Sequence, residues 1–425
     1  MRRLIVCVDG GWDDSVPRHS SILHLLRSIE SSDTRSTPPV MQFAHYATAH
    51  FDTSLFSQLL GYSYASFSHL LFELYAFLSM NYTEDSQILL FGYSKGAYMV
   101  RILAAFINDI GILPRDDLTK FHSLLHAYFD RKAGAPHAHD ILKPWLLSSP
   151  TNTRHKHQQY IITCLGLFDC TVQSQPSLLH RKIASISTPE SFLGLPDALL
   201  GERIQYAYHA VALHENRRDV RHLRMISRGE PGQRSKQVWF NGSSGDIGGV
   251  CALRELSDIA RVWMASQVSP LLALNKEVLL ESIHTPMFRY GIQPPHNPHT
   301  AKLTTLMPVK RRPHLVHTHT HQELIHSSVL AGSLDLAEPL VAAIERNTAL
   351  IDDLEELEDD LIRQWTVDAR DAARLVITYA IDHKHYDEVE KQTWFDRLLY
   401  SIQLVVVYFV LVFLGKVEML FGLFA

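Results

Sequence analysis

The stretch that decides the fold is "LLFGYSKGAYMVRIL", which runs from Leu89 to Leu103. The apolar run Ile88–Phe91 predicts a buried strand, and the apolar spacing from Ala97 onward predicts a helix. Between them, Gly92–Gly96 predicts a tight turn with Ser94 at its centre, because a side chain at either glycine would collide with a neighbouring element. A nucleophile elbow requires this strand, turn and helix. The plain alternative is a glycine-punctuated turn in an α/β sheet.

Short apolar runs alternate with helical patterns over the first two-thirds of the chain. The predicted strands are Leu4–Val8, Val40–Tyr46, Ile88–Phe91, Ile161–Phe168 and Val238–Phe240. The predicted helices are Ser21–Ile29, Tyr64–Met80, Ala97–Asp109, Arg203–His214 and Glu255–Ser266. This alternation predicts an α/β domain with a mainly parallel sheet.

Composition limits the classes of function. With 46% apolar and 20% charged residues over 425 positions, the chain has the composition of a globular protein. Its net charge of −5 gives no electrostatic reason to bind nucleic acid. The cysteines Cys7, Cys164, Cys170 and Cys251 are few and widely spread, which favours a reduced, intracellular compartment. The N-terminal apolar run stops at Asp9 and is too short for a signal peptide.

The pattern changes after residue 290. We expect an α/β domain over 1–290, a proline- and histidine-rich loop over 291–333, and a helical extension over 334–395. The extension contains the acidic run Asp352–Asp360. Leucines at helical spacing accompany the run: Leu350, Leu354, Leu357 and Leu361. This spacing predicts that the acids form the solvated face of a packed helix rather than a cation site.

The C-terminal region contains the uncharged run "LLYSIQLVVVYFVLVFLG", Leu398–Gly415, bounded by Arg397 and Lys416. It reaches the minimum of roughly 17 residues for a transmembrane helix. Another apolar piece, "VEMLFGLFA", follows it. These features favour a membrane anchor at 398–415, and a buried core helix or strand pair is the alternative.

Polar residues that follow the predicted strands are the first candidates for a site, since ligands gather at the carboxyl ends of parallel strands. The first strand ends in Asp9-Gly10-Gly11, whose backbone N–H groups are placed to stabilise an oxyanion together with the N–H of Lys95. A plain tight turn explains the glycines equally well.

The later strands end in acids. "GLFDCT" leaves Asp169 where a triad acid would stand, although a capping aspartate fits the same spacing. "WFNGSSGDIGG" combines glycines with Asp246 and suggests a close-packed functional loop. A Ser-Asp-His order would place a histidine in this last segment, and it contains none.

Five motifs together carry a resemblance to a known family. "LIVCVDGGWDD", "LLFGYSKGAYMVRILAAFINDIGIL", "LGLFDCT", "ALHENRRDV" and "VWFNGSSGDIGG" occur in order over about residues 1–265. In order and spacing they resemble the α/β-hydrolase family common in fungi that also forms the catalytic domain of type VI secretion phospholipase effectors. The resemblance implies an α/β-hydrolase-like fold, a serine lipase or esterase activity and no cofactor.

The resemblance also implies a triad. The family's elbow serine and its acid correspond to Ser94 and Asp169, and the position of the family's histidine is Ser244. Two lesser departures are Gly11, where the family has threonine, and Lys95, where it has arginine. Lysine keeps the charge but lacks the planar, bidentate fork of arginine.

The serine at position 244 removes the expected base. A serine hydroxyl cannot take a proton from Ser94 at neutral pH, and general-base catalysis is typically worth about 10²–10⁴-fold. The best substitutes are His317, His319 and His321, whose alternation turns them to one side of an extended segment. Zinc binding there is disfavoured because no carboxylate or cysteine completes a ligand spacing, so we expect no metal site.

A basic cluster follows "HEN" and contains Arg217, Arg218, Arg221 and Arg224. Such a cluster can recognise a phosphate or carboxylate head group, and Arg217 and Arg218 are the candidate anion-binding residues. The alternative is a basic segment that pairs with acidic neighbours.

Two hypotheses of function remain open. One is an esterase or phospholipase-like hydrolase, anchored to an intracellular membrane, that acts on a lipid or other ester with Ser94 and Asp169. The other is a catalytically inactive relative, a pseudoenzyme that binds a lipid or a protein partner. Loss of the family histidine favours the second, and the retained elbow favours the first.

Overall fold

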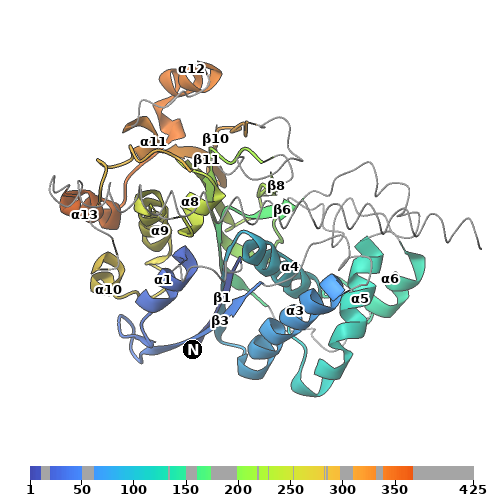
Figure 1. Cartoon of the computed structure of the whole chain (residues 1–425). Helices are drawn as coiled ribbons and strands as arrows, with labels where there is room; N and C mark the ends of the chain where they lie inside the picture. The colour runs from blue at the N-terminus through green and yellow to red at the C-terminus, as the bar shows by residue number, and fades with distance from the viewer. Residues whose placement is uncertain are drawn as a thin grey trace, which may run out of the picture.

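The structure is a computed structural model and describes residues 1–10, 20–49, 62–132, 135–149, 160–173, 199–217, 220–227, 229–251, 253–281, 283, 286–296, 310–331 and 338–366. A ten-stranded sheet runs through the centre of these residues (Figure 1). Its strands are β1 (Arg2–Asp9), β2 (Ser32–Asp33), β3 (Val40–Thr48), β4 (Ser86–Tyr93), β5 (Ile162–Phe168), β7 (Ile204–Ala212), β9 (Arg234–Phe240), β10 (Val316–His317), β11 (His321–His326) and β12 (Ile351–Asp352).

The strand order is β10-β11-β9-β7-β5-β4-β1-β3-β2, with β12 also paired to β11. The pairs β2·β3 and β10·β11 are antiparallel and the other pairs are parallel. The carboxyl ends of β1, β4, β5, β7 and β9 therefore lie along one edge of the sheet. A separate two-stranded ladder joins β6 (Thr171–Gln173) and β8 (Val220–His222) near this edge.

Helices cover both faces of the sheet (Figure 1). One face carries α3 (Tyr62–Asn81), α4 (Lys95–Ile110), η1 (Arg115–Lys120), α5 (Phe121–Lys132) and α6 (Pro136–Leu142). The other carries α1 (Ser21–Ser28), α8 (Ser244–Gly248), α9 (Glu255–Val268), α10 (Lys276–Glu281) and α13 (Glu356–Gln364). At the β11 end lie α11 (Ser328–Ala331), α12 (Glu338–Arg346) and η3 (Thr348–Leu350). The α/β-hydrolase-like architecture expected from the sequence is confirmed.

Two large hydrophobic cores result from this layering, and a third, smaller cluster lies around Trp239 and Ile325. Along β1, Leu4, Val6 and Val8 belong to the core beneath α3, α4 and α5, whereas Ile5 and Cys7 belong to the core beneath α1 and α9. A strand buried on both faces has an unbroken apolar sequence because neither face meets water. This explains why the short apolar runs of the chain could be recognised as strands.

All five predicted strands are present, and one predicted helix is wrong. Within 203–214, residues Ile204–Ala212 form β7, a central strand whose neighbours are β5 and β9. Its alanines and its other apolar residues, interrupted by Gln205 and His209, match a buried helix as well as a buried strand, and periodicity alone does not separate the two. Pairing on both sides decides the outcome, since it satisfies the backbone of a segment that is buried on both faces.

The predicted loop over 291–333 is wrong for His321–His326, because these residues form β11 and pair with β9. The part of 334–395 that is described packs on the same sheet through β12 and on α9 through α13. Leu361 is buried on α13 as expected. Two of the acids predicted to be solvated are instead buried: Asp352 accepts a hydrogen bond from Trp263, and Glu358 contacts His326.

The candidate membrane span at 398–415 lies outside the described residues. Among the described helices, none is by itself long and apolar enough to cross a membrane, although the bent pair Lys95–Ile110 and Arg115–Arg131 meets the length and composition criteria jointly.

A buried hydrogen-bond chain attaches α13 to the end of β11. The His326 ring lies 2.8 Å from a Glu358 carboxylate oxygen through Nε2 and 2.7 Å from the Ser328 hydroxyl through Nδ1. All three side chains are at most 2% exposed, and Phe240 stacks on the imidazole. Both ring nitrogens of His326 therefore have a hydrogen-bond partner, and removing one of the three side chains would leave a buried polar group unpaired, which lowers stability.

We expect Glu358→Ala to lower the free energy of unfolding by about 1–3 kcal/mol, because it leaves the buried imidazole without its partner. Glu356→Ala is the matched control on an exposed position of the same helix and should change stability by less than about 0.5 kcal/mol. Thermal or urea unfolding measures both variants, and equal effects would contradict the structural role of the His326 chain.

Candidate active site

Ser94 lies at a strained strand-to-helix turn at the carboxyl edge of the sheet. It joins β4 to α4 with φ 52° and ψ −114°, and its N–H donates to the Phe168 carbonyl at 3.0 Å. Among the described non-glycine residues, only Ser94 and Asp169 have a positive φ. Such backbone strain concentrates at functional sites, where the surrounding structure holds it in place.

The glycines beside Ser94 are required by close packing. A Cβ atom on Gly92 would lie 2.6 Å from the Ala97 backbone, and one on Gly96 would lie 2.2 Å from the Val8 carbonyl oxygen. Real Cβ atoms do not approach backbone atoms so closely. The sequence-based reason for both glycines is therefore confirmed.

Gly10, which follows β1, lies directly against the elbow. A Cβ on Gly10 would be 3.0 Å from the Tyr93 carbonyl oxygen and 3.1 Å from the Ser94 Cβ. Asp9 is buried and accepts hydrogen bonds from the Gly10 N–H at 2.9 Å, the Tyr46 hydroxyl at 3.2 Å and the Ser20 hydroxyl. Asp9 thus holds Gly10 in place beside Ser94.

The remaining members of the predicted oxyanion region are Gly11 and Lys95. Gly11 lies outside the described residues, and Lys95 begins α4 directly after Ser94. The Lys95 N–H therefore belongs to the first turn of α4, whose N-terminal end carries the positive end of the helix dipole.

Asp169 follows β5 and is completely buried in an ion pair that the sequence did not predict. Both of its carboxylate oxygens accept from the Arg311 guanidinium, at 2.5 and 3.3 Å, and one also accepts from the Ala212 N–H at 3.1 Å. Burial raises the pKa of Asp169, but the charge and hydrogen bonds of Arg311, with those from Ser244 and Ala212, outweigh burial and hold the pKa below its ordinary value.

Ser244 lies beside Asp169. It is the first residue of α8, and its side chain acts with Arg311 to lower the pKa of Asp169. The structure therefore brings Ser244 to the same place as Asp169, whose carboxylate is paired with the Arg311 guanidinium.

The hydroxyl of Ser94 forms a hydrogen bond with Thr171 Oγ1 at 3.1 Å. Thr171 starts β6, two residues after Asp169. Of the histidines that the structure describes, none forms a hydrogen bond with this hydroxyl. Since a threonine hydroxyl is no base at neutral pH, the contact orients Ser94 without activating it.

Two described histidines, His209 and His222, lie in the neighbourhood of Asp169 but make their contacts with other residues. His209 is buried in β7, where its Nε2 accepts the Cys170 N–H at 2.9 Å. Burial lowers the pKa of His209 to about 3, so its imidazole is neutral in the native protein. The ring of His222 lies 5.1 Å from that of His209, and burial lowers the pKa of His222 as well.

The three histidines proposed as substitute bases lie at the other end of the sheet. His321 pairs with Ser235 at the amino end of β9, and its Nδ1 lies 2.8 Å from the Ser235 hydroxyl. Four strand spacings of about 4.8 Å separate β11 from β4, so this segment, including His317 and His319, does not reach Ser94. Within the described residues, no group of three potential metal-binding side chains occurs.

Asp246 has a scaffolding role at the start of α8. It closes a capping box with Ser243, whose N–H and hydroxyl both donate to Asp246 Oδ2, at 2.8 and 2.9 Å. The same oxygen accepts from the His296 N–H at 2.9 Å. Asp246 thereby fixes the helix turn that holds Ser244 against Asp169.

The candidate anion-binding arginine Arg217 is paired with a buried acid. Glu215 accepts two hydrogen bonds from the Arg217 side chain, at 2.8 and 2.9 Å, and one from the Ser244 N–H at 3.3 Å. Arg218 lies outside the described residues. Arg224 in turn pairs with Glu323 at 2.5 Å, so the pairing with acidic neighbours describes Arg217 and Arg224 better than an open anion site.

Four residues of the site were not predicted from the sequence: Thr171, His209, Glu215 and Arg311. Thr171 could have been proposed from its place just after a strand, as Asp169 was. Arg311 carries no such signal, because it lies 142 residues from Asp169 in a segment that has no strand or helix pattern. Only the folded chain brings the two together.

Comparison with known proteins gives a family match over most of this region. A family profile described as "T6SS, Phospholipase effector Tle1-like, catalytic domain" matches residues 2–267. No curated protein matches the chain.

Two solved structures are similar at 14% identity and a TM-score of 0.33. One is described as "Structure of the Tle1 effector bound to the VgrG spike from the Type 6 secretion system", with 58% of this chain and 51% of that chain covered. The other is the crystal structure of an uncharacterized protein from Pseudomonas aeruginosa, with 64% and 46% covered. The chain thus spans about half the length of these two proteins.

The ion pair between Arg311 and Asp169 gives a test of the site's electrostatics. Arg311→Leu leaves a buried carboxylate without its charge partner and should lower the free energy of unfolding at pH 7 by about 3–5 kcal/mol. Adding Asp169→Asn to this variant removes the unpaired charge and should restore part of the loss. Urea unfolding of the two variants and the unchanged protein measures the coupling.

The pH dependence has a definite sign. In the unchanged protein the pKa of Asp169 is lowered, so the stability that the pair contributes is present above about pH 3.9 and is lost as pH falls through the native pKa. In Arg311→Leu burial alone would raise this pKa. The stability gap between the two proteins should therefore shrink on acidification from neutral pH, and a constant gap would contradict the pairing.

Proposed function

Because the chain belongs to the family of Tle1-like phospholipase effector catalytic domains of the type VI secretion system, we propose that it binds a lipid or related ester at the Ser94 elbow and hydrolyses it weakly or not at all. Family membership supports a lipase- or esterase-like function. The finer proposal concerns how the site of this particular chain departs from a working triad.

The observation that carries the proposal is the occupation of Asp169. In a serine hydrolase the acid orients a histidine and stabilises its imidazolium after proton transfer. Here both oxygens of the carboxylate accept from Arg311, and the side chain of Ser244 also helps to lower the pKa of the carboxyl group. The negative charge that would support an imidazolium is already neutralised.

The chemistry left to the described residues is binding and orientation. Ser94 is held at the tip of the turn by its strained backbone and by Thr171. In this proposal the backbone of Gly10, which lies against Ser94, and the Lys95 N–H would receive the carbonyl oxygen of the substrate. Attack by Ser94 would have to release its proton to water, because neither Thr171 nor Ser244 can accept it. We therefore expect a rate about 10²–10⁴-fold below that of a complete triad, or less.

A working hydrolase is the second candidate. It is favoured by the positive φ of Ser94 and by glycines that fit the elbow closely, since both are features of a nucleophile held in place. This candidate requires a base that reaches Ser94 in the substrate complex. The two candidates differ in one measurable property, the reactivity of the Ser94 hydroxyl.

Reactivity toward a fluorophosphonate probe tests the proposal. We expect little labelling of the folded protein, with Ser94→Ala as the background control, because an unactivated serine reacts slowly with such probes. Strong labelling that disappears in Ser94→Ala would refute weak catalysis and establish the hydrolase candidate.

Restoring the base gives the complementary test. Ser244→His combined with Arg311→Gln frees Asp169 and supplies an imidazole beside it, and it should raise hydrolysis of a short-chain phospholipid or p-nitrophenyl ester at least tenfold. Ser244→Ala with Arg311→Gln is the matched control, and circular dichroism checks the fold of both. No gain in a folded double variant would mean that the site's defect lies elsewhere.

We further propose that the run at 398–415 anchors the protein to an intracellular membrane. The run is uncharged and just long enough to span a bilayer, and such an anchor would hold the elbow close to lipid. We expect the full chain to stay in the membrane pellet after a high-salt wash and to be released by detergent, whereas a chain ending at Asp396 should be soluble and folded. Release by salt alone, or aggregation of the shortened chain, would argue against the anchor.

A further inference from the structure

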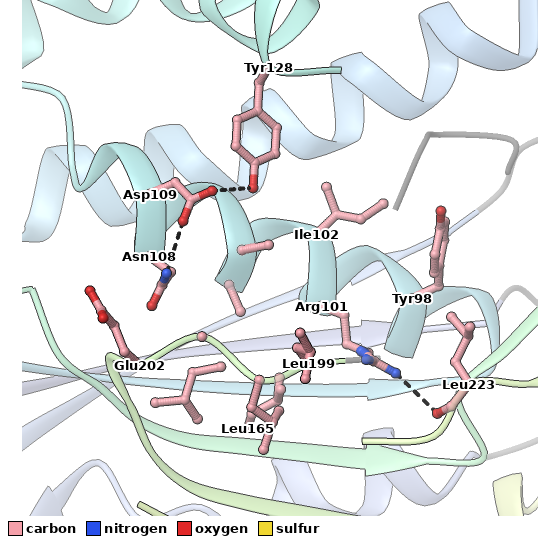
Figure 2. Close-up of a pocket in the computed structure, with 15 residues that line it drawn as sticks. Tyr98, Arg101, Ile102, Asn108, Asp109, Tyr128, Leu165, Leu199, Glu202 and Leu223 are labelled. Carbon is pink, nitrogen blue, oxygen red and sulfur yellow. Dashed lines mark hydrogen bonds between the residues drawn. The ribbon is translucent and has the colours of Figure 1, made fainter. Parts of the chain in front are cut away.

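A cavity of about 260 Å³ lies beside α4, away from the elbow (Figure 2). Its charged side chains are paired with other parts of the protein. Asp109 accepts from the Tyr128 hydroxyl at 3.0 Å, Arg101 donates to two backbone carbonyls, and Glu202 pairs with Arg203 at 3.8 Å. These pairings indicate no particular ligand for the cavity.

A group of exposed apolar side chains lies instead near the N-terminus, where β3 and α3 run side by side (Figure 1). Met41 and Phe43 on β3 are 47% and 40% exposed, and Met80 near the end of α3 is 53% exposed. At about 200 Å² for each fully exposed side chain, this methionine patch presents about 300 Å² of apolar surface. On a soluble protein, patches of a few hundred Å² commonly mark interaction sites.

Contacts at two levels show that the patch is one continuous surface. His45, on the same face of β3 as the patch, stacks on Phe77 of α3 with ring centroids 5.1 Å apart. Arg2 is the strand partner of Met41, and its guanidinium donates to the Asn81 carbonyl at 3.3 Å. The second half of α3 therefore lies along this face of β3, which makes the three patch side chains neighbours.

The strand β3 also has an uncovered edge. β2 pairs only with Val40 and Met41, and the next outward N–H, that of Gln42, donates to the Ser31 carbonyl at 2.9 Å. Because backbone groups of alternate residues point to the same side of a strand, those of Ala44 also face away from β1. Ala44 is exposed, and among the described strands only β1 pairs with it. Such an edge is a template for pairing with another strand.

The rim of the patch carries both signs of charge. Arg115 donates to the Met80 carbonyl at 2.7 Å, and Arg2 lies beside the start of β3. Glu73 on α3 is 45% exposed, and Glu84, just after α3, is exposed. A partner with one strong charge, such as a nucleic acid or an anionic bilayer, would be repelled by part of this rim. A second copy of the chain carries both signs, and two-fold symmetry brings the basic groups of each copy toward the acidic groups of the other.

The place of the patch in the fold also favours a second copy over a membrane. Met41 lies at the amino end of β3, whereas Ser94 lies at the carboxyl edge of the sheet. A bilayer bound at the patch would hold the elbow away from lipid. A second copy bound at the patch leaves the elbow open.

We propose that the methionine patch and the edge of β3 form the interface of a two-fold symmetric homodimer. The two β3 strands pair antiparallel about an axis at Ala44, and the two α3 helices approach each other over the patch. This pairing continues the sheet from one copy into the other and gives the outward backbone groups their partners. A standard interface buries about 800 Å² on each partner, of which the patch supplies about 300 Å² and the strand edge and charged rim the remainder. The dimer does not depend on hydrolysis at Ser94.

Sedimentation of the full chain tests the proposal, in a detergent matched in density to the solvent so that micelles add no apparent mass. We expect a dimer at about 10 μM protein, because interfaces of this size reach micromolar affinity or better. A monomer at that concentration would overturn the proposal.

Two variants locate the interface at the patch. Phe43→Glu and Met80→Glu each place a charge in it and should weaken dimerisation by about tenfold or more, with circular dichroism as the check of the fold. Ile141→Glu, at a position on α6 that is 52% exposed and outside the patch, is the matched control and should leave the dimer unchanged. A folded Met80→Glu variant that dimerises like the unchanged protein, or equal weakening by Ile141→Glu, would overturn the proposal.

A cysteine at the symmetry axis tests the pairing of the strands. Residues directly opposite each other in an antiparallel pair have Cα atoms about 4.5–5.5 Å apart, which a disulfide can bridge. Mild oxidation of Ala44→Cys should therefore link two copies, as seen by gel electrophoresis without reductant. Glu356→Cys, at an exposed position on α13, is the matched control and should give no more linkage than the unchanged protein. A dimeric Ala44→Cys variant that links no better than this control would overturn the paired-strand interface.

Discussion

The close approach of α4 to the end of β1 is the constraint on which the rest of the site depends. Gly96 lies so near the Val8 and Asp9 carbonyls that no Cβ fits between them. This contact brings the first turn of the helix onto the carboxyl edge of the sheet and forces Ser94 into a positive φ. The strain is sustained by two hydrophobic cores, one on each face of a sheet whose central strands are buried on both sides.

The same edge collects the polar groups at the strand ends because the strands are parallel. Asp9 ends β1, Ser94 and Asp169 follow β4 and β5, and α8 brings Ser244 in from the end of β9. The architecture thus brings Ser94, Asp169 and Ser244 to one place. In the proposed function, what departs from a hydrolase is the serine at position 244 and the arginine that neutralises Asp169.

The pairing of Asp169 with Arg311 follows from the cost of burying an unpaired charge. A buried carboxylate with no histidine to orient would be an unpaired charge in a low-dielectric site, which is costly. Arg311 removes that cost with a guanidinium that the site's geometry receives through both carboxylate oxygens. In the proposed function, serine at position 244 and the presence of Arg311 can therefore be understood together: the carboxylate keeps a partner, but the partner is not a base.

The sequence by itself determined the elbow, five of the sheet's strands and the positions of Ser94 and Asp169, because each depends on a local pattern of apolar runs, glycines and strand ends. Ser244 was singled out only through the family resemblance. The strand within residues 203–214 was predicted as a helix, since a buried strand and a buried helix have similar sequences. The partners of the site residues, Thr171 for Ser94 and Arg311 for Asp169, were decided by tertiary structure alone. An ion pair between residues 142 positions apart leaves no local pattern, because its energy arises only when folding brings both charges out of water together.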